Sequence, residues 1–576
     1  MDEDGGLMQF FSATERSHNL SLLARERFDV LVIGGGVTGA GVALDAAARG
    51  YTVALVEKED FASGTSSKST KLVHGGIRYL PQFDFALVHE ALIERGLLLQ
   101  NAPYLVQPVG FVLPIYKGDY HPVGIPFTTP GGIGLSFILN NGLWLYDILA
   151  GRYNRERRHQ HLRRSEVLEL APALLPEGLK EGFIYYDAQT NDARLTMALI
   201  RTAAQYGATV TNYTEVISFV TEQQKVCGVH LQDCLAGDNR QITVRARHIV
   251  NATGIFAEQV EALTGHEPQF QIKPSKGVHL VFSREDVQLG DAALVLPETD
   301  DKRILFLVPW ESRAIYGTTD TGSGALDHPM TTREDIFYLL NHLNRYLSIQ
   351  LSEENIVTTF AGYRPLIRSR SSKHATAKLS RTHAVLQSPA GLVSIIGGKL
   401  TTYRRMAQDT VDVLNRRDGM LRPLHPTENL PLYGSADWSA VQHELEVKGA
   451  SLELSSQTLK HLGRTYGSEA IALLRLVEED ASLALCLIDD LPYIRAEVVY
   501  ACRQEMAMTP YDVLARRTSI TLEDRQRGLG ILDEIATLMT KEHNWTPEQR
   551  QFMINVYRTA MEEQIAHEQM GEKVLG

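Results

Sequence analysis

The sequence predicts an α/β fold: a dinucleotide-binding Rossmann domain interleaved with a mainly β domain, followed by a C-terminal helical domain. Three observations lead to this prediction. A strand, a glycine-rich turn, a helix and a second strand succeed one another between residues 28 and 57. Strand-like segments then dominate residues 183–360, with returns to the first domain. From about residue 441 onward the apolar residues recur at helical spacing.

The first strand and turn carry a nucleotide-binding motif. Residues 28–33 are apolar and rich in β-branched side chains, which is typical of a strand buried on both faces. The spacing G-x-G-x-x-G follows at once, on Gly34, Gly36 and Gly39. The first glycine permits a tight turn, the second leaves room for a pyrophosphate, and the third lets the next helix pack on the sheet.

An acidic residue closes this unit. Helical spacing over residues 37–49 precedes an apolar strand over residues 51–56, and Glu57 follows. A carboxylate about 20 residues after the first glycine binds a ribose hydroxyl, which favours NAD or FAD over NADP. A glycine-rich turn in an ordinary α/β domain is the alternative, but it would not explain strand, helix, strand and acid in register.

A serine- and threonine-rich segment comes next, and it carries a family resemblance. Residues 65–80 read TSSKSTKLVHGGIRYL, which resembles the signature of the FAD-dependent glycerol-3-phosphate dehydrogenases. Further motifs of that family follow in the same order: DARL at 192–195, NATG at 251–254, KGVHL at 276–280, GTTD at 317–320, YRPL at 363–366 and GGKLTTYR at 397–404. The resemblance covers residues 28 to about 404 and is weaker beyond.

This resemblance implies a fold, a cofactor and a reaction. The fold would be a two-dinucleotide-type FAD-binding Rossmann domain interleaved with a mainly β substrate domain, as in D-amino-acid oxidases. The cofactor would be FAD, and the enzyme would oxidise sn-glycerol 3-phosphate to dihydroxyacetone phosphate by hydride transfer to the flavin. We expect a membrane quinone as the electron acceptor. Glycerol-3-phosphate oxidases, which reduce dioxygen, are the close relatives and the alternative.

The resemblance also implies roles for residues at matching positions. Substrate binding is expected at Arg78, Tyr79, Arg364 and Lys399, because cations hold a phosphate dianion. Catalysis is expected at the family positions His279, Arg364 and Lys399, and at His74 as a second candidate base. Histidine titrates near neutral pH, so either histidine could be the base, and a structural contact to the cofactor is the alternative for His74. Tyr363 stands where relatives often carry a smaller residue.

The cofactor is expected to contact the glycine-rich turn and the short motifs that end the other strands. The residues concerned are Gly34, Gly36, Gly39, Glu57, Thr65, Ser66, Ser67, Ala252, Thr253, Gly254, Gly317, Asp320, Gly398 and Thr401.

Composition and charge exclude several classes of function. The chain has 576 residues, enough for two or three domains, and a formal net charge of −12. A general nucleic-acid binder would be basic, so this negative net charge argues against that function. The four cysteines show no metal-ligand spacing, so we expect no metal, and they suit inert buried thiols in a reducing compartment.

One window suggests contact with a membrane. Residues 120–146 contain no Asp, Glu, Lys or Arg, residues 133–149 are mostly apolar, and six arginines follow between positions 152 and 164. Such a surface could dip into an anionic bilayer without spanning it. A helical subdomain packed on the body, with a solvated arginine-rich loop, is the alternative.

No apolar leader is present in the first residues, so we expect a cytoplasmic protein, peripheral on the inner face of the membrane. The sequence leaves a homodimer open.

Four regions are expected along the chain. Residues 1–27 form a loosely held extension, residues 28–414 the oxidoreductase body, residues 415–440 a linker rich in Pro and Gly, and residues 441–576 the helical domain.

Three other functions would fit only part of the sequence. An NAD-linked dehydrogenase would share the first unit but would not explain the serine-rich segment or GGKLTTYR. A non-enzymatic flavin-binding scaffold would need no cationic pocket. An amino-acid or amine oxidase of the same fold would not need the extra cations.

Overall fold

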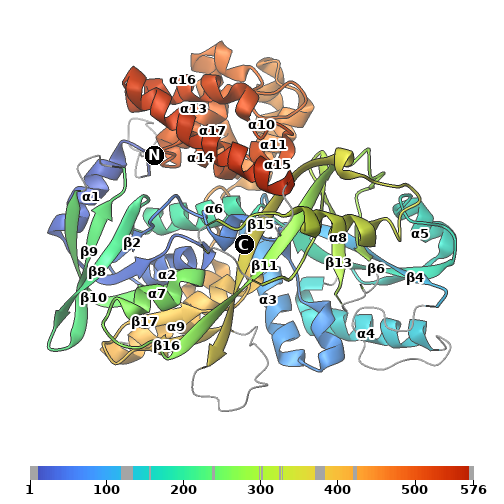
Figure 1. Cartoon of the computed structure of the whole chain (residues 1–576), viewed down its shortest axis with the longest axis horizontal. Coiled ribbons are helices and arrows are strands. Elements are labelled where there is room, and N and C mark those ends of the chain that lie inside the picture. Colours follow the sequence, from blue (N-terminus) through green and yellow to red (C-terminus); the bar gives the residue numbers. More distant parts are fainter. Residues whose placement is uncertain are drawn as a thin grey trace.

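The computed structural model describes residues 11–118, 134–154, 157–235, 240–296, 299, 303–322, 326, 328–369, 383–419 and 425–569. A body of two interleaved domains carries a separate helical domain on one side, drawn in orange and red in Figure 1. The predicted α/β fold with its C-terminal helical domain is confirmed.

An eight-stranded sheet forms the first domain. Its order is β16-β17-β10-β1-β2-β7, with β9 beside β10 and β8 beside β9, and the five strands from β17 to β7 run parallel. The central strands are buried on both faces, as their continuous apolar runs require. The strands are β1 (Arg27–Ile33), β2 (Val53–Val56), β7 (Thr209–Thr211), β8 (Thr214–Glu222), β9 (Lys225–Asp233), β10 (Gln241–Asn251), β16 (Ala384–Gln387) and β17 (Val393–Ile396).

Three helices pack together in this domain. The helix after the glycine turn, α2 (Val37–Ala48), lies between α6 (Asp192–Gln205) and α9 (Tyr403–Asp418). It is rich in Ala and Gly and almost wholly buried, so its neighbours can approach it closely. A short helix, α7 (Ala257–Ala262), follows the end of β10.

A nine-stranded sheet forms the second domain. Its order is β15-β11-β14-β13-β12-β4-β6-β3, with β5 beside β6. The long antiparallel pair of β11 and β15 places His279 opposite Phe360 and Ser275 opposite Arg364. The strands are β3 (Leu72–Val73), β4 (Gln107–Tyr116), β5 (Gln160–Arg163), β6 (Leu179–Gln189), β11 (Phe270–Ser283), β12 (Ala293–Leu296), β13 (Leu305–Trp310), β14 (Arg313–Gly317) and β15 (Ile356–Ser369).

Helices cover the two faces of this second sheet. Along β4, Phe111 and Leu113 pack in one apolar core, and Val112 packs in another, as alternation along a strand demands. The first core is completed by α3 (Phe85–Asn101) and α4 (Leu135–Ala150), the second by α5 (Arg164–Leu170) and α8 (Arg333–Leu343).

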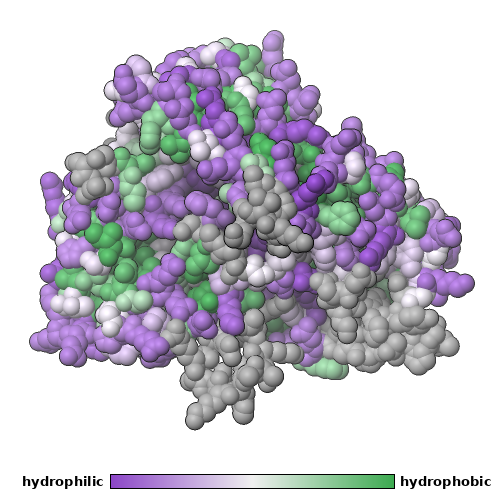
Figure 2. All heavy atoms as spheres, viewed as in Figure 1, coloured by the Kyte–Doolittle hydropathy of each residue, from purple (hydrophilic) through white to green (hydrophobic). Residues whose placement is uncertain are grey.

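The C-terminal domain is helical and has its own cores. A capping box begins its last helix: Thr546 and Gln549 each accept, with a side-chain oxygen, a hydrogen bond from the other's backbone N–H, at 3.3 and 2.9 Å. On the face of the whole molecule shown in Figure 2, the surface is mainly hydrophilic, with smaller apolar groups between the hydrophilic residues. The helices are α10 (Trp438–Ser451), α11 (Ser456–Tyr466), α12 (Ala470–Glu479), α13 (Arg495–Gln504), α14 (Pro510–Asp512), α15 (Ile520–Glu523), α16 (Leu532–His543) and α17 (Pro547–Gln569).

The chain before the body is packed rather than loosely held. Helix α1 (Glu15–Arg25) buries Leu20 and Leu23, and Arg16 forms a buried 2.7 Å ion pair with Asp233. The expectation of a loose extension is therefore wrong for this helix, because its apolar residues find a partner surface far along the chain.

Two further expectations need correction. The stretch predicted as a linker packs on the body: α9 continues to Asp418, and Leu430 and Leu432 are buried in the core of the first domain. Of the cysteines, Cys502 is buried and Cys227 half-buried, but Cys234 and Cys486 are exposed, so the expectation of buried thiols fails for these two.

The window predicted to contact a membrane is only partly described, since residues 119–133 and 155–156 lie outside the described part of the chain. The described portion forms α4, whose Leu139, Leu143 and Tyr146 are buried against the body. Phe137, Trp144 and Ile148 point outward and are 73%, 44% and 68% exposed. Every helix of the described ranges is too short or too polar to cross a bilayer.

Candidate active site

The glycine-rich turn is built so tightly that side chains are excluded. A Cβ atom on Gly39 would lie 1.9 Å from the carbonyl oxygen of Gly34, and one on Gly34 would lie 2.7 Å from that of Ala252. The first turn of α2 therefore presses directly on the strand end. A Cβ on Gly36 would meet Ser66 Oγ at 3.0 Å, so this glycine keeps the turn open where a pyrophosphate is expected.

Glu57 stands beside this turn. One carboxylate oxygen accepts a 2.6 Å hydrogen bond from the backbone N–H of Gly35, and the other accepts one of 3.0 Å from Glu59. Burial raises the pKa of Glu57 to about 7. A carboxylate at this strand end, next to a turn without side chains and the N-terminus of α2, fits the adenosine diphosphate half of FAD.

The serine-rich segment joins the turn to the second sheet. Ser66 Oγ accepts a 2.9 Å bond from the backbone N–H of Val37, at the start of α2, and Thr65 Oγ1 donates one of 2.6 Å to the carbonyl of Tyr363 on β15. Ser67, in the same short helical turn, accepts a bond from Lys71 Nζ at 3.2 Å. The segment thus bridges the two domains.

The NATG motif ends the strand next to β1. The backbone N–H of Ala252 donates to the carbonyl of Ile33 at 2.9 Å, and Thr253 Oγ1 donates to Asn251 at 2.6 Å. Gly254 has a φ of +58° and begins the next turn. Parallel strands bind ligands at their carboxyl ends, and the motif, Glu57 and the glycine turn all lie at such ends of neighbouring strands.

His279 lies on β11 and is buried. Its Nε2 is 2.9 Å from Thr70 Oγ1, and its ring stacks on Phe360 with the centroids 4.6 Å apart. Burial, with the positive charges of Arg364 and Lys71, holds the pKa of His279 well below its ordinary value. The imidazole is therefore neutral at neutral pH and able to accept a proton. A Cβ on Gly317 would lie 2.5 Å from the ring, so Gly317 makes room for it.

Arg364 lies on the neighbouring strand and is half-buried. Its guanidinium donates to Ser275 Oγ at 3.2 Å and to Thr318 Oγ1 and the Thr319 carbonyl at 3.1 Å each. Asp320 is 3.9 Å away. Four neighbours thus fix the Arg364 guanidinium in one orientation, as selective recognition of an anion requires. We refer to Thr70, His279, Phe360 and Arg364 as the His279 group.

A second group forms around Lys399. Its Nζ lies 4.1 Å from the centre of the Tyr79 ring, and Arg78 donates to the Tyr79 hydroxyl at 2.9 Å. The backbone N–H of His74 donates to Thr401 Oγ1 at 3.1 Å. Residues from two distant motifs, HGGIRYL and GGKLTTYR, are thereby held together. We refer to His74, Arg78, Tyr79, Lys399 and Thr401 as the Lys399 group.

The two groups are linked by one short stretch of chain. Thr70 belongs to the first and His74 to the second, and Leu72–Val73 between them form β3 of the second sheet. Gly398 precedes the second group; a Cβ there would lie 2.3 Å from Met406 Sδ. Gly317 and Asp320, which we predicted to contact the cofactor, lie beside His279 and Arg364.

Sequence reasoning missed several residues of the site. Lys71 is buried and forms a 2.5 Å ion pair with Asp192, which also accepts bonds from the backbone and side chain of Ser69. Both partners lie inside quoted motifs, TSSKSTK and DARL, so their presence in the family signature was the available signal. The described residues hold no group of three or more His, Cys, Asp or Glu suited to a metal ion.

Comparison with known proteins agrees with this geometry. Residues 29–404 match the family model described as FAD dependent oxidoreductase, and residues 425–550 match the C-terminal domain of alpha-glycerophosphate oxidase. A solved glycerol-3-phosphate dehydrogenase from Bacillus halodurans, complexed with FAD, is 31% identical with a TM-score of 0.77, covering 96% of this chain and 98% of that one.

Two named relatives extend over nearly the whole chain. Glycerol-3-phosphate dehydrogenase 2 of Mycobacterium tuberculosis is 40% identical over 526 residues, 91% of this chain and 86% of that protein. The mitochondrial glycerol-3-phosphate dehydrogenase of Homo sapiens is 36% identical over 581 residues, 96% of this chain and 76% of that protein. With the family model matching the body and this identity sustained into the helical domain, the chain belongs to the family of FAD-dependent glycerol-3-phosphate dehydrogenases.

Proposed function

We propose that this protein oxidises sn-glycerol 3-phosphate to dihydroxyacetone phosphate. The observation that carries the proposal is the pairing of a neutral, buried histidine with a fixed arginine fork on adjacent strands, His279 and Arg364. Oxidation of a secondary alcohol needs a base for the hydroxyl proton, and a phosphorylated substrate needs cations. The names of the relatives support this substrate.

In this proposal each group of residues has its own task. The neutral imidazole of His279 takes the hydroxyl proton, and Thr70, 2.9 Å from Nε2, fixes the orientation of the ring. Arg364 and Arg78 bind the phosphate and the negative charge that develops on the substrate, and Lys399 stabilises the negative charge of the reduced flavin or of the substrate beside it. When bound, FAD accepts the hydride from the substrate carbon. His74, whose backbone is tied to Thr401, positions the turn that carries Arg78.

The electron acceptor in this proposal is a membrane quinone, and dioxygen is the alternative. The outward side of α4 supports the quinone. Phe137, Trp144 and Ile148 are exposed there, and the Arg158 guanidinium lies 5.8 Å from the Trp144 ring. Exposed apolar side chains beside exposed arginines favour peripheral attachment to an anionic membrane surface, which would be the inner face of the cytoplasmic membrane.

Anaerobic reduction of the bound flavin tests the proposal. Glycerol 3-phosphate should bleach the flavin absorbance, while glycerol at the same concentration should do so poorly, because each charge-assisted contact to the phosphate contributes about 1.5–3 kcal/mol. Equal rates with both compounds would reject a phosphate-binding site. Faster reduction by an amino acid than by glycerol 3-phosphate would favour an amino-acid oxidase. Reoxidation by a soluble quinone, compared with dioxygen, then decides the acceptor.

A further inference from the structure

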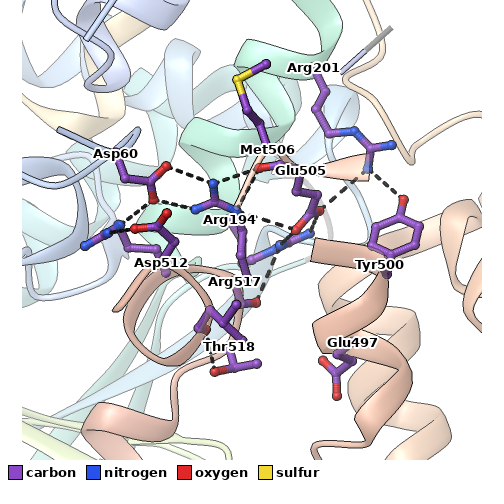
Figure 3. A network of polar contacts seen from close by, with 12 residues as sticks. Asp60, Arg194, Arg201, Glu497, Tyr500, Glu505, Met506, Asp512, Arg517 and Thr518 are labelled. Carbon is purple, nitrogen blue, oxygen red and sulfur yellow. Dashed lines mark hydrogen bonds and ion pairs between the residues drawn. The ribbon is translucent and has the colours of Figure 1, made fainter. Parts of the chain in front are cut away.

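A buried ionic network joins the C-terminal domain to the loop that follows Glu57. Asp60 in this loop accepts two hydrogen bonds from Arg517, at 2.6 and 2.9 Å (Figure 3). It accepts one more, of 2.6 Å, from Arg516. Asn212 donates a fourth bond at 3.0 Å. The side chains of Asp60 and Arg517 are fully buried. Although burial opposes its ionised form, Arg517 and Arg516 lower the pKa of Asp60 to about 2.

The far side of the network belongs to the C-terminal domain itself. Arg517 also donates to the Glu505 carbonyl at 2.7 Å, and Arg516 donates to Asp512 at 2.6 Å. Across the interface, the Glu505 carboxylate accepts bonds of 2.6 Å from both terminal nitrogens of Arg194, on α6 of the body (Figure 3). The two arginines that reach Asp60 are thus oriented by their own domain before they meet the loop.

The anchored loop lies on the glycine turn. The Ala62 N–H donates to the Gly35 carbonyl at 3.1 Å, and a Cβ on Gly35 would lie 2.8 Å from the Phe61 ring. On the other side of Asp60, the Glu59 and Glu57 carbonyls accept bonds of 2.7 and 2.6 Å from the segment after β7. Asp60 therefore stands between Glu57, which is expected to bind the ribose, and residues 61–62, which pack on the glycine turn.

We propose that Asp60 is a positioning residue for the cofactor, and that the C-terminal domain acts on FAD binding through Arg516 and Arg517. This inference rests on the proposed flavin chemistry and extends it to a domain whose described residues include none of those named above for the site. Fixing the 57–62 loop in one conformation before binding removes an ordering cost that FAD binding would otherwise bear. The effect falls on the adenosine diphosphate half of FAD, the half that the loop faces.

The test uses the full chain with Asp60→Asn, which keeps the shape of the side chain and removes its charge. The dissociation constants of FAD and of ADP for the apoprotein should both rise at least tenfold. At saturating FAD, the rate of flavin reduction by glycerol 3-phosphate, the substrate KM and the flavin potential should equal those of the parent. Arg517→Lys, which keeps one charge but not the fork, should give a smaller effect in the same direction.

Arg201→Gln is the matched control. Arg201 is a buried arginine of α6 that crosses the same interface, where it donates to the Tyr500 hydroxyl at 2.7 Å and lies 3.6 Å from the Glu505 carboxylate (Figure 3). It also lies 3.5 Å from Glu469. Among the described residues, its hydrogen-bond and ion-pair partners all lie outside the 57–62 loop, and Asp60, Arg516 and Arg517 are not among them. It should lower the unfolding temperature, while FAD and ADP bind as in the parent at temperatures well below unfolding.

Three results would overturn the inference. The first is unchanged FAD and ADP affinity in Asp60→Asn. The second is an equal loss of affinity in Arg201→Gln, which would make docking of the whole domain the cause. The third is a reduced rate of flavin reduction in Asp60→Asn at saturating FAD, which would mean that Asp60 acts on the reaction itself and not only on FAD binding. If Asp60→Asn does not fold, Arg517→Lys is read by the same criteria. A parent that binds FAD but is not reduced by glycerol 3-phosphate would refute the proposed substrate and leave this inference standing.

Discussion

The backbone N–H of Gly75 donates a 3.0 Å hydrogen bond to the carboxylate of Asp187. The same carboxylate is fully enclosed: Tyr146 donates to it at 2.7 Å and Arg95 at 2.6 Å. Gly75 begins the turn that brings Arg78 and Tyr79 to Lys399. A single buried acid on β6 thus connects the turn to α4, the helix that supplies Tyr146.

Asp187→Asn should therefore affect both stability and substrate binding. The change leaves Arg95 buried without its counter-ion, which costs about 3–5 kcal/mol of stability. It also loosens the turn, so the KM for glycerol 3-phosphate should rise about tenfold through misplacement of Arg78. Denaturant unfolding and steady-state kinetics measure the two effects. Asp233→Asn, which removes the buried partner of Arg16, should reduce stability and leave the KM unchanged. An unchanged KM in Asp187→Asn would separate the acid from the site.

The protonation of His279 should appear in the pH profile of kcat/KM. The neutral ring is the active base, so activity rises with pH through its pKa. Burial and the charges of Arg364 and Lys71 hold that pKa well below its ordinary value, so the acidic decline should lie below pH 6.5. His279→Gln should reduce kcat/KM about 10²- to 10⁴-fold and remove the decline. If His74→Gln removes it instead, the roles of the two histidines are reversed.

The sequence predicted the first βαβ unit to within one or two residues at most boundaries. The helix predicted at 37–49 is Val37–Ala48, and the strand predicted at 28–33 is Arg27–Ile33. Glycines, apolar runs and a terminal acid all act locally there, so the signals agree.

Helical spacing alone could not identify the buried face of α17. Phe552, Val556 and Ala560 stand at helical spacing in the sequence, but Phe552 and Val556 are 63% and 51% exposed. The buried residues are Ile554, Tyr557 and Met561, a second stripe of suitable spacing. Which stripe faces the protein depends on tertiary packing, and the sequence pattern carries no information about it.

The contacts within the candidate site could not be predicted from the sequence either. Family motifs supplied the residues of the His279 and Lys399 groups except Phe360, but not how those residues contact one another. Phe360 stacks on His279 only because β11 and β15 pair in a particular register. The network at Asp60 joins residues more than 450 positions apart, and no local pattern reveals such a contact.

Acid should weaken the contact between the C-terminal domain and the body. Since the pKa of Asp60 is lowered to about 2, its stabilising contribution is complete above its ordinary value of 3.8 and is lost as the pH falls toward 2. Asp512 changes stability with pH in the opposite direction, because burial and the negative charge of Asp60 raise the pKa of Asp512. Unfolding free energies of the parent and Asp60→Asn should differ most above pH 4 and converge toward pH 2. A constant difference across that range would contradict the lowered pKa.

Arg364 and Lys399 should act on different charges. Arg364→Ala should raise the substrate KM or slow flavin reduction about ten- to a hundredfold, equivalent to one lost charge-assisted contact, and leave the flavin potential almost unchanged. Lys399→Ala should lower the potential, because a cation near the reduced, anionic flavin has gone. Rapid-reaction reduction and potentiometry separate the two. A shifted potential in Arg364→Ala with none in Lys399→Ala would exchange the assignments.

The outward residues of α4 should decide attachment to membranes. Replacing Phe137, Trp144 and Ile148 by Ser removes exposed apolar side chains while leaving the buried Leu139, Leu143 and Tyr146 in place, so the fold and the rate with a soluble acceptor should persist. Co-sedimentation with anionic vesicles should fall sharply. Binding by the parent should weaken at high salt, because the exposed arginines after α4 are screened within about 10 Å at 0.1 M salt.

The control is Phe552→Ser with Val556→Ser, which removes two equally exposed apolar residues from α17 in the other domain and should leave sedimentation unchanged. Parent protein that remains in solution with anionic vesicles at low salt would leave α4 as a packed helix with a solvated outer side, and would favour dioxygen or a soluble acceptor over a membrane quinone.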